Sequence, residues 1–282
     1  TLGRPLVERL ACAGHQVVAL DRDAPAARRA MKRFPAEVVS KFVDVRDTSG
    51  LQAATEGADA VFHGAGLLPP LTDFEPDFAH EINVGGLENL IGALSKTAPD
   101  ALLVFPSSIT VYGDTQHLEP PRRTSDPVQP TDCYSQHKID CESLVRTHAG
   151  PWSILRVAAS IDPDPRRADR HTMSMLFEAH ADSRIELLHP RDAALAIARL
   201  IENEAAWNRL FNLGGGPNCR VRLKEMVDGL FSAAGMGPVP AAAFGDRGYY
   251  TDWLDTEEIQ SLLDFQQTSF DEMLTEARNR LR

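Results

Sequence analysis

The sequence predicts an α/β fold, a doubly wound parallel sheet followed by a smaller C-terminal α/β region. Short apolar strands alternate with helices from the start of the chain to about residue 160, a pattern typical of a parallel sheet with helices on both faces. Beyond that point strands become sparse. We therefore expect a main domain in residues 1–160 and a small region in residues 161–282, with some later strands and helices returning to the main sheet.

Hydrophobic periodicity and turn residues define the elements of the main domain. The first helix runs from Arg4 to Ala13 and ends at Gly14, a residue favoured where helices stop. Pro25 suits the start of the second helix, which extends to Arg33. The other elements predicted here are the strands Val17–Leu20, Val38–Val45, Ala60–Phe62 and Ala101–Phe105 and the helices Leu51–Thr55 and Asp77–Leu94.

The same alternation continues into the second half of the chain. A helix from Tyr134 to about Thr147 precedes a strand over Trp152–Val157, and Asp162–Arg170 is predicted as a loop because it is rich in Pro, Asp and Arg. Asp192 is expected to cap a helix that runs to Glu202. The other elements predicted here are a strand over Leu210–Leu213, a helix over Leu223–Ala234 and a charged C-terminal helix.

Composition limits the class of function. The 282 residues have a formal net charge of −11, whereas nucleic acids and anionic membranes call for a basic face. No apolar run approaches the roughly 20 residues that span a bilayer. The four cysteines share no CxxC spacing, and the nine histidines do not pair at metal-ligand spacing. We expect a cytoplasmic protein with reduced thiols, no metal, and a small-molecule substrate rather than nucleic acid or a membrane.

Asp21 suggests a dinucleotide site, because it ends an apolar strand 18 positions after Gly3, which opens a helix. A glycine there lets the backbone approach a pyrophosphate, and an acid at the strand end bonds the ribose hydroxyls. An ordinary strand-end aspartate explains the pair equally well. As a cofactor residue, Asp21 would repel a 2′-phosphate and favour NAD over NADP, although the neighbouring Arg22 could turn to receive such a phosphate.

Tyr134 and Lys138 form the motif that points most directly to catalysis. Residues four apart share a helix face, so the phenol and the ammonium point the same way. A free phenol has a pKa of about 10, and a nearby ammonium, helped by an oxidised nicotinamide, would stabilise the phenolate and lower that pKa. Tyr134 could then take a proton from a substrate hydroxyl. Alone, such a pair mostly means a packed ring beside a solvated amine.

These motifs occur together in an order that resembles the extended short-chain dehydrogenase/reductase superfamily, in its NAD-dependent epimerase/dehydratase branch. The segments that carry the resemblance are Gly3-Arg4-Pro5-Leu6-Val7, Ala19-Leu20-Asp21-Arg22, Asp44-Val45-Arg46-Asp47, Asn83-Val84-Gly85-Gly86, Phe105-Pro106-Ser107-Ser108-Ile109-Thr110-Val111-Tyr112-Gly113 and Tyr134-Ser135-Gln136-His137-Lys138. The resemblance implies a Rossmann fold and NAD as the cofactor, with NADP as the less favoured choice. It covers almost the whole chain.

The resemblance also implies roles for individual residues. Ser108 would hydrogen-bond the reacting oxygen beside Tyr134, and Lys138 would bond the nicotinamide ribose. The other cofactor residues that it implies are Asp44 and Val45 beside the adenine, Gly64, Ala65 and Gly66 beneath the ribose and diphosphate, and Asn83 as a structural helix residue near the cofactor.

The family commonly dimerises through the helix that bears Tyr134 and Lys138 and the long helix before it. This implies a homodimer held by a four-helix bundle, although the same apolar residues could instead cover the sheet. Those residues are Ile139, Leu144 and Val145 against Leu87, Leu90 and Ile91.

The resemblance further suggests that the first strand of the sheet and two glycines of the phosphate loop are missing from the sequence as given. We expect roughly a dozen more residues upstream, an apolar strand running into Gly-x-x-Gly.

The expected substrate region departs from the pattern of sugar-nucleotide epimerases. These enzymes carry an Arg, an Asn three residues later and then Gly-Pro. Here Arg156 is followed by Ala159 and by Asp162-Pro163, which argues against a diphosphate-sugar. The Asp-Pro run resembles a loop of uronate dehydrogenases. Possible substrate contacts are Ser108, Arg156, Arg166, Arg170 and Arg191, although the loop arginines could equally be solvated.

Three functions remain open from the sequence. The first is an NAD-dependent epimerase/dehydratase-type oxidoreductase that acts on a sugar or sugar-nucleotide hydroxyl. The second is a dehydrogenase or reductase of a small non-nucleotide substrate, such as a uronate or polyol. The third, a non-catalytic dinucleotide-binding regulatory protein, is disfavoured because both Tyr134 and Lys138 are present.

Overall fold

A parallel β-sheet forms the centre of the molecule. The computed structural model describes residues 2–164, 170–248 and 250–281. Strands β3 (Ala60–Phe62), β4 (Leu102–Ser108), β5 (Trp152–Val157) and β8 (Arg209–Leu213) pair in that order, all in parallel. Strands β1 (Val18–Asp21) and β2 (Val39–Phe42) form a separate parallel pair. The predicted α/β class with a parallel sheet is therefore confirmed.

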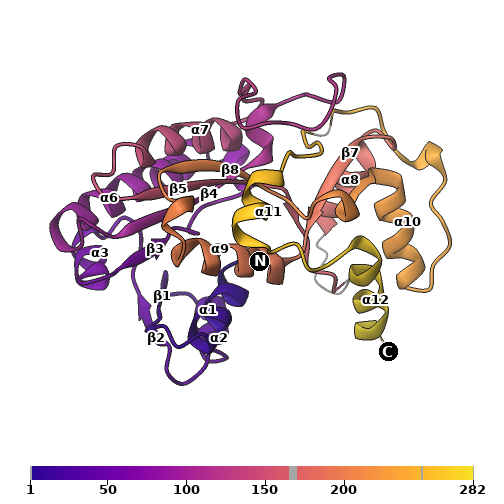
Figure 1. Ribbon diagram of the computed structural model, residues 1–282. Coiled ribbons are helices and arrows are strands. Elements are labelled where there is room, and N and C mark those ends of the chain that lie inside the picture. Colours follow the sequence, from indigo (N-terminus) through magenta and orange to yellow (C-terminus); the bar gives the residue numbers. More distant parts are fainter. Residues whose placement is uncertain (1, 165–169, 249, 282) are drawn as a thin grey trace.

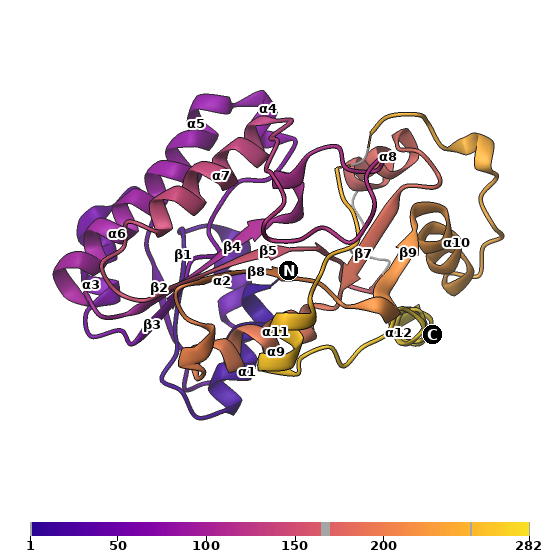
Figure 2. The same ribbon diagram turned by 45° about the horizontal axis from the view of Figure 1, so that its top comes forward.

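Both faces of the four-stranded sheet are buried. In β4, Leu102 and Val104 face one apolar core, whereas Leu103 and Phe105 face another, and none of the four is more than 2% exposed. Helices α1 (Gly3–Cys12), α9 (Pro190–Ile201) and α11 (Glu257–Leu263) contribute to the first core. Helices α3 (Thr48–Thr55), α6 (Gly86–Thr97) and α7 (Cys133–Val145) contribute to the second. Figure 2 shows α6 and α7 side by side on one side of the sheet and α1, α9 and α11 on the other.

The apolar residues expected at a dimer interface are used within the chain. Leu87, Leu90 and Val145 are at most 3% exposed and belong to the core between the sheet and its helices. Ile91 and Leu144 pack partly buried against the same core. These side chains therefore cover the sheet, as the alternative interpretation held, and homodimerisation stays a prediction.

The C-terminal region builds a second, smaller sheet, on the right of Figure 1. Strand β7 (Arg184–Leu188) pairs in parallel with β6 (Ala159–Ser160) and antiparallel with β9 (Arg220–Arg222). Helices α8 (Arg170–Glu178), α10 (Leu223–Ala233) and α12 (Phe270–Leu281) lie around it. The sequence did not predict these strands. Two charged residues of β7, Arg184 and Glu186, interrupt its apolar pattern, although both are buried and paired.

The long helix predicted over Asp77–Leu94 is divided by an irregular turn. It consists of α5 (Pro76–His80), a π-helical turn over Glu81–Gly85 and then α6, and it follows the short helix α4 (Leu71–Phe74). Single π turns within α-helices are frequent at functional sites. Asn83, which the resemblance places near the cofactor, lies in this turn.

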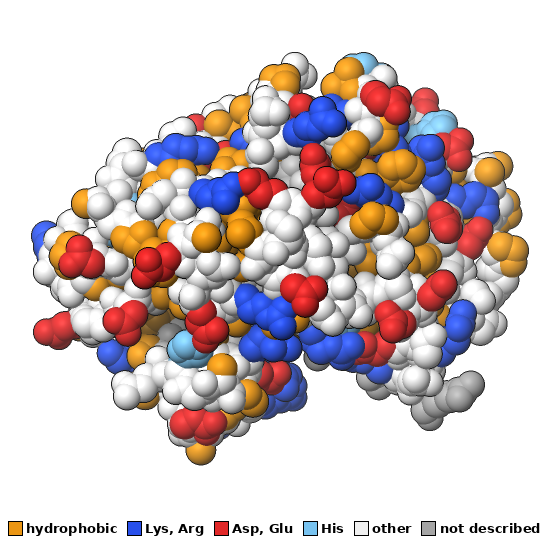
Figure 3. Space-filling view, viewed as in Figure 1, with side chains coloured by type: hydrophobic (Ala, Val, Ile, Leu, Met, Phe, Trp, Pro, Cys, Tyr) orange, Lys and Arg blue, Asp and Glu red, His pale blue; other side chains and the backbone are white. Residues whose placement is uncertain are grey.

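The charge of the molecule is dispersed on the face that Figure 3 shows, where acidic and basic side chains alternate. The net charge of −11 is therefore not gathered into one patch on that face. Cys12, Cys133, Cys141 and Cys219 are all free thiols. Among the described residues, no helix combines the length and apolar character that crossing a bilayer requires.

Candidate active site

Ser108, Tyr134 and Lys138 come from neighbouring elements. Ser108 is the last residue of β4, and α7, which packs against β4, carries the other two in its first turns. The start of α7 is fixed by Asp132, whose carboxylate accepts a 2.7 Å hydrogen bond from the Ser135 backbone N–H, while the Ser135 hydroxyl oxygen accepts one from the backbone N–H of Asp132. This capping box sets where Tyr134 lies along the helix.

Lys138 lies half-buried between the helix and the sheet. Its ammonium donates a 2.6 Å hydrogen bond to the Pro106 carbonyl and lies 4.6 Å from the centre of the Phe105 ring. It is 5.6 Å from the centre of the Tyr134 ring. Burial lowers the pKa of Lys138 to about 8, since desolvation disfavours the charged form. The predicted neighbourhood of phenol and amine is thus present.

The pKa of Tyr134 differs from the expectation. Burial raises it to about 12, while the Ser108 hydroxyl acts in the opposite direction. The sequence predicted a pKa lowered by Lys138 together with the positive charge of an oxidised nicotinamide. Here the desolvation of the phenol dominates, and the Lys138 ammonium is directed to the Pro106 carbonyl. An added positive charge near the phenol is needed before it can act as a base near neutral pH.

A glycine loop follows β3 beside this group. Gly64, Ala65 and Gly66 are all exposed, and a Cβ at Gly64 would come within 2.8 Å of the Phe62 ring. A Cβ at Gly66 would lie 3.2 Å from the Asn83 side-chain oxygen. At Gly64 and Gly66 the loop therefore exposes backbone without a side chain, which lets a ribose or a phosphate approach closely.

Asn83 secures the end of this loop. Its side-chain oxygen accepts a 2.6 Å hydrogen bond from the Leu67 N–H, and its amide donates to the Leu67 carbonyl at 3.0 Å. His63, which precedes the loop, is buried, and its Nε2 has no hydrogen-bond partner. Burial lowers the pKa of His63 to about 4, so the ring is neutral at pH 7. The π turn at Asn83 also contacts α7, because the Asn83 side-chain nitrogen lies 3.4 Å from a ring nitrogen of His137, the residue before Lys138.

The residues expected at the adenosine end lie at the ends of β1 and β2. Asp21 is exposed, and one of its oxygens accepts a 2.8 Å hydrogen bond from the N–H of Arg22, which is also exposed. The Asp44 carboxylate is held by the Arg46 guanidinium through two hydrogen bonds of 2.9 Å, and this pairing lowers the pKa of Asp44 to about 2. Asp44 therefore stays ionised throughout the physiological range.

Val45 and Gly3, also predicted as cofactor residues, differ in their surroundings. The Val45 carbonyl accepts a 3.1 Å hydrogen bond from the Asn89 side chain, and a Cβ at Gly86 would come within 2.7 Å of the Val45 side chain. Val45 is thus packed against α6. Gly3 is the exposed first residue of α1, and a Cβ there would meet nothing within 4 Å.

The arginines expected to contact substrate are placed differently from one another. Arg156 is 5% exposed and makes two 2.9 Å hydrogen bonds to the Glu142 carboxylate. Arg191 pairs with Glu276 of α12 at 2.6 Å. Arg166 lies outside the described residues, as does the side chain of Arg170 at the start of α8. Arg156 and Arg191 thus both have carboxylate partners inside the chain.

Glu142 is the residue at this site that sequence reasoning missed. It is 4% exposed and accepts a 2.7 Å hydrogen bond from Ser107, the residue before Ser108, as well as the two from Arg156. Its position four residues after Lys138 puts both on one helix face, and that spacing was the available signal.

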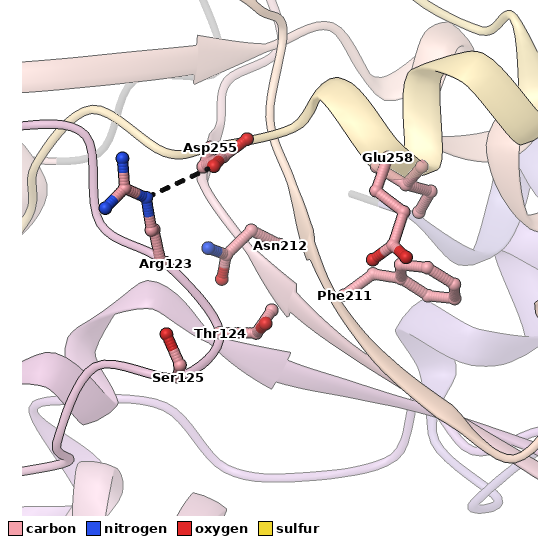
Figure 4. A pocket seen from close by; sticks show the side chains of 8 residues that line it. Arg123, Thr124, Ser125, Phe211, Asn212, Asp255 and Glu258 are labelled. Carbon is pink, nitrogen blue, oxygen red and sulfur yellow. Dashed lines mark ion pairs between the residues drawn. The ribbon is translucent and has the colours of Figure 1, made fainter.

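A separate cavity of about 170 Å³ lies beside β8. Figure 4 shows Arg123 and Asp255 joined by an ion pair near Asn212, with Phe211 and Glu258 on the other side. Asn212 links this cavity to the interior, since its side-chain oxygen accepts a 2.7 Å hydrogen bond from the Tyr112 hydroxyl. None of the site residues predicted from the sequence lines it.

Comparison with known proteins places these features in a family. The family model described as the NAD dependent epimerase/dehydratase family matches residues 1–214. The 3 beta-hydroxysteroid dehydrogenase type 7 of Rattus norvegicus is 31% identical over 115 residues, 41% of this chain and 33% of that protein. The 3 beta-hydroxysteroid dehydrogenase/Delta 5-->4-isomerase of Mycobacterium tuberculosis is 26% identical over 198 residues, 68% of this chain and 52% of that protein. The matches thus span about a third to a half of these curated relatives.

Solved structures share the fold over the whole chain. The crystal structure of a UDP-glucuronic acid 4-epimerase from Bacillus cereus, in complex with UDP-4-deoxy-4-fluoro-glucuronic acid and NAD, superposes with a TM-score of 0.81. The match covers 100% of this chain and 96% of that one, at 17% sequence identity. At that identity the likeness shows the fold alone, and the chemistry rests on the site residues.

Proposed function

Because the chain belongs to the NAD-dependent epimerase/dehydratase family, we propose that it is an oxidoreductase that moves a hydride between a secondary alcohol carbon of a sugar or sugar nucleotide and NAD. The observation that carries this proposal is the placement of Tyr134 and Lys138 on α7 near Ser108 at the end of β4, with the exposed Gly64–Gly66 loop after the neighbouring strand β3. A proton acceptor, a hydroxyl donor and a half-buried cation then lie at one edge of the sheet, where ligands bind in open α/β folds.

The residues present fit a dinucleotide. The bare loop at Gly64 and Gly66 offers a surface that a Cβ would fill, and Asp21 offers an exposed carboxylate to ribose hydroxyls. Asp44, ionised beside Arg46, would receive the adenine amino group. When bound, NAD supplies the hydride acceptor and a positive charge near the phenol. Asp21 favours NAD over NADP because two negative groups would repel.

Tyr134 would act as the acid/base. As a phenolate it would accept the proton of the substrate hydroxyl while the carbon–hydrogen bond breaks, and in reverse it would protonate the alkoxide. Ser108 would donate a hydrogen bond to the reacting oxygen. Lys138 would release the Pro106 carbonyl or share its protons with the nicotinamide ribose, and its ammonium would help to lower the pKa of Tyr134.

A second candidate is a dehydrogenase of a small substrate without a nucleotide, such as a uronate or polyol. Ala159 lies in β6, where epimerases of the family carry an asparagine, and its methyl group offers no hydrogen bond to a diphosphate. Asp162 adds negative charge nearby and pairs with Arg280 at 3.3 Å. The two curated relatives are hydroxysteroid dehydrogenases, which favours this second reaction type and adds a further alcohol class to test.

Turnover with a panel of alcohols separates these candidates. The purified full chain is mixed with NAD⁺ and sugars, sugar nucleotides, uronates, polyols or 3β-hydroxysteroids, and both NADH absorbance and product composition are followed. Interconversion of a sugar nucleotide without free NADH supports an epimerase, whereas stoichiometric NADH supports a dehydrogenase. Tyr134→Phe should slow either reaction about 10²–10⁴-fold, while Lys96→Met on the exposed face of α6 serves as a control. Turnover at the native rate in Tyr134→Phe contradicts the proposed function.

A further inference from the structure

Thr110 makes two hydrogen bonds to the oxygen of Ser108. The Thr110 backbone N–H donates to the Ser108 Oγ at 3.2 Å, and the Thr110 hydroxyl lies 2.9 Å from the same atom and donates to it. Both bonds arise where β4 ends and a 3₁₀ turn, Ile109–Tyr112, begins with Ser108 as its N-cap. The turn therefore folds Thr110 back over the serine that precedes it.

This arrangement restricts what the Ser108 hydroxyl can do. A serine hydroxyl has one proton to donate and two lone pairs with which to accept. Thr110 supplies two donors, so both lone pairs are occupied and the proton of Ser108 remains to be donated elsewhere. Because Ser108 is 8% exposed, bulk water has little access to compete for that proton.

We propose that Thr110 is a positioning residue that makes Ser108 a dedicated hydrogen-bond donor, to Tyr134 in the free enzyme and to the reacting oxygen once substrate is bound. The inference rests on the proposed function, since it assigns Ser108 a task in that reaction. A hydroxyl that accepts hydrogen bonds also becomes a stronger donor, because hydrogen bonds in a chain polarise one another. Thr110 thus acts through Ser108 and need not touch the substrate.

The groups around Tyr134 support this direction of hydrogen bonding. Burial and the nearby Asp132 carboxylate raise the pKa of Tyr134, whereas the Ser108 hydroxyl lowers it, as a donor to the phenolate does. Lys138 faces the ring from the same helix, and it lies close enough to His63, just after β3, to lower the pKa of that imidazole. In the described chain the Thr110 side chain hydrogen-bonds to Ser108 and to none of these groups, so its replacement acts first on Ser108.

Matched variants of Thr110 test the proposal. Thr110→Val keeps the shape and removes the hydroxyl, whereas Thr110→Ser keeps the hydroxyl. We expect Thr110→Val to lower kcat about tenfold with KM within about twofold, a smaller loss than the about 10²–10³-fold effect of removing a transition-state donor. The acid limb of its pH profile should move to higher pH because the pKa of Tyr134 rises. Thr110→Ser should restore both kcat and the profile.

The double variant shows whether Thr110 acts through Ser108. Adding Thr110→Val to Ser108→Ala should cause no further loss of kcat, because the group that Thr110 orients is already gone. A further tenfold loss in the double variant would overturn the proposal, since Thr110 would then act on substrate or on the fold directly.

A measurement without turnover separates this inference from the proposed function. With 3-fluorotyrosine in place of Tyr134, the phenol is more acidic and its ¹⁹F signal reports its pKa directly. We expect that pKa to be higher by about half a unit in Thr110→Val, unchanged in Thr110→Ser, and equal in Ser108→Ala and the double variant. Equal pKa values in the native and Thr110→Val proteins would overturn the inference. Absence of NAD-dependent turnover, with the pKa shift present, would refute only the proposed function.

Discussion

Replacing Glu142 with alanine should destabilise the protein strongly. Glu142 connects α7 to two strands that end beside the site. Its carboxylate accepts hydrogen bonds from Ser107 in β4 and from Arg156 in β5. Burial alone would lower the pKa of Arg156, but its interactions with Glu142 and Tyr112 together outweigh burial and hold the pKa above its usual value. The guanidinium thus remains charged in the interior and depends on this carboxylate.

The magnitude follows from what Glu142→Ala leaves behind. Arg156 is 5% exposed, so its charge would remain buried without its carboxylate partner, and the Ser107 hydroxyl would lose its acceptor. Removing one partner of a buried ion pair costs about 3–5 kcal/mol of unfolding free energy. Replacing both partners should cost less than the sum of the single changes, since Glu142→Ala with Arg156→Met leaves no buried charge unpaired.

Urea unfolding followed by tryptophan fluorescence measures these free energies. Glu88→Ala, on the exposed face of α6, is the control and should change the unfolding free energy by less than about 0.5 kcal/mol. The midpoint should fall in Glu142→Ala without a change in the slope of free energy against urea. A loss below about 1 kcal/mol, or strict additivity in the double variant, would refute the reasoning.

Three further predictions concern glycine geometry, pH and a second buried pair. Gly113→Ala should lower the unfolding free energy by at least about 2 kcal/mol and reduce activity, because Gly113 has φ of 70° and a Cβ would lie 2.2 Å from a backbone oxygen. The control Gly92→Ala, where α6 leaves open space for a Cβ, should be neutral or slightly stabilising. Equal effects of the two changes would contradict this prediction. The pKa of His63 is lowered to about 4, so on acidification the unfolded chain binds this proton before the folded chain does. The unfolding free energy should therefore fall by about 3 kcal/mol as pH drops from about 6.5 to about 4. Urea titrations at each pH should show a smaller fall in His63→Gln, and the same fall as in the native protein would argue against this assignment. Asp252→Asn removes the charge that faces two buried arginines and should lower the urea midpoint by the equivalent of about 3 kcal/mol, whereas a native midpoint would count against this role.

Much of the main domain could be predicted because its local and global signals agree. The strands around Leu102–Phe105 and Trp152–Val157 are short apolar runs, and parallel sheets bury such runs on both faces. Tyr134 was identified because its spacing from Lys138 puts both on one helix face, and Ser108 because the segment around it resembles that of the family. Their approach is a consequence of the parallel topology.

The C-terminal region was harder to predict because its polar residues are buried. Strand β7 was missed since Arg184 and Glu186 break the apolar pattern, and only their distant partners Asp252 and Arg220 explain how they can lie inside. Such partners lie far along the chain and leave no local signal.

The role of Asp192 shows the same limit. The sequence predicts Asp192 as the helix cap, but the cap is His189, whose ring accepts a 3.0 Å hydrogen bond from the Arg191 N–H. Asp192 instead accepts two backbone N–H bonds and the hydroxyl of Thr268 from the segment before α12. The Asp192 carboxylate thus holds a segment distant in the chain, a role that hydrophobic periodicity does not predict.

The cytoplasmic location stays a prediction.

The central claim is that Tyr134 carries a proton in an NAD-dependent oxidation. The most direct measurement is single-turnover hydride transfer, read as NADH absorbance, with the native chain, Tyr134→Phe and the control Lys96→Met under saturating NAD⁺ and the best alcohol from the panel. We predict that Tyr134→Phe slows hydride transfer about 10²–10⁴-fold while NAD⁺ affinity is unchanged. Equal rates in the native and Tyr134→Phe proteins would contradict the claim.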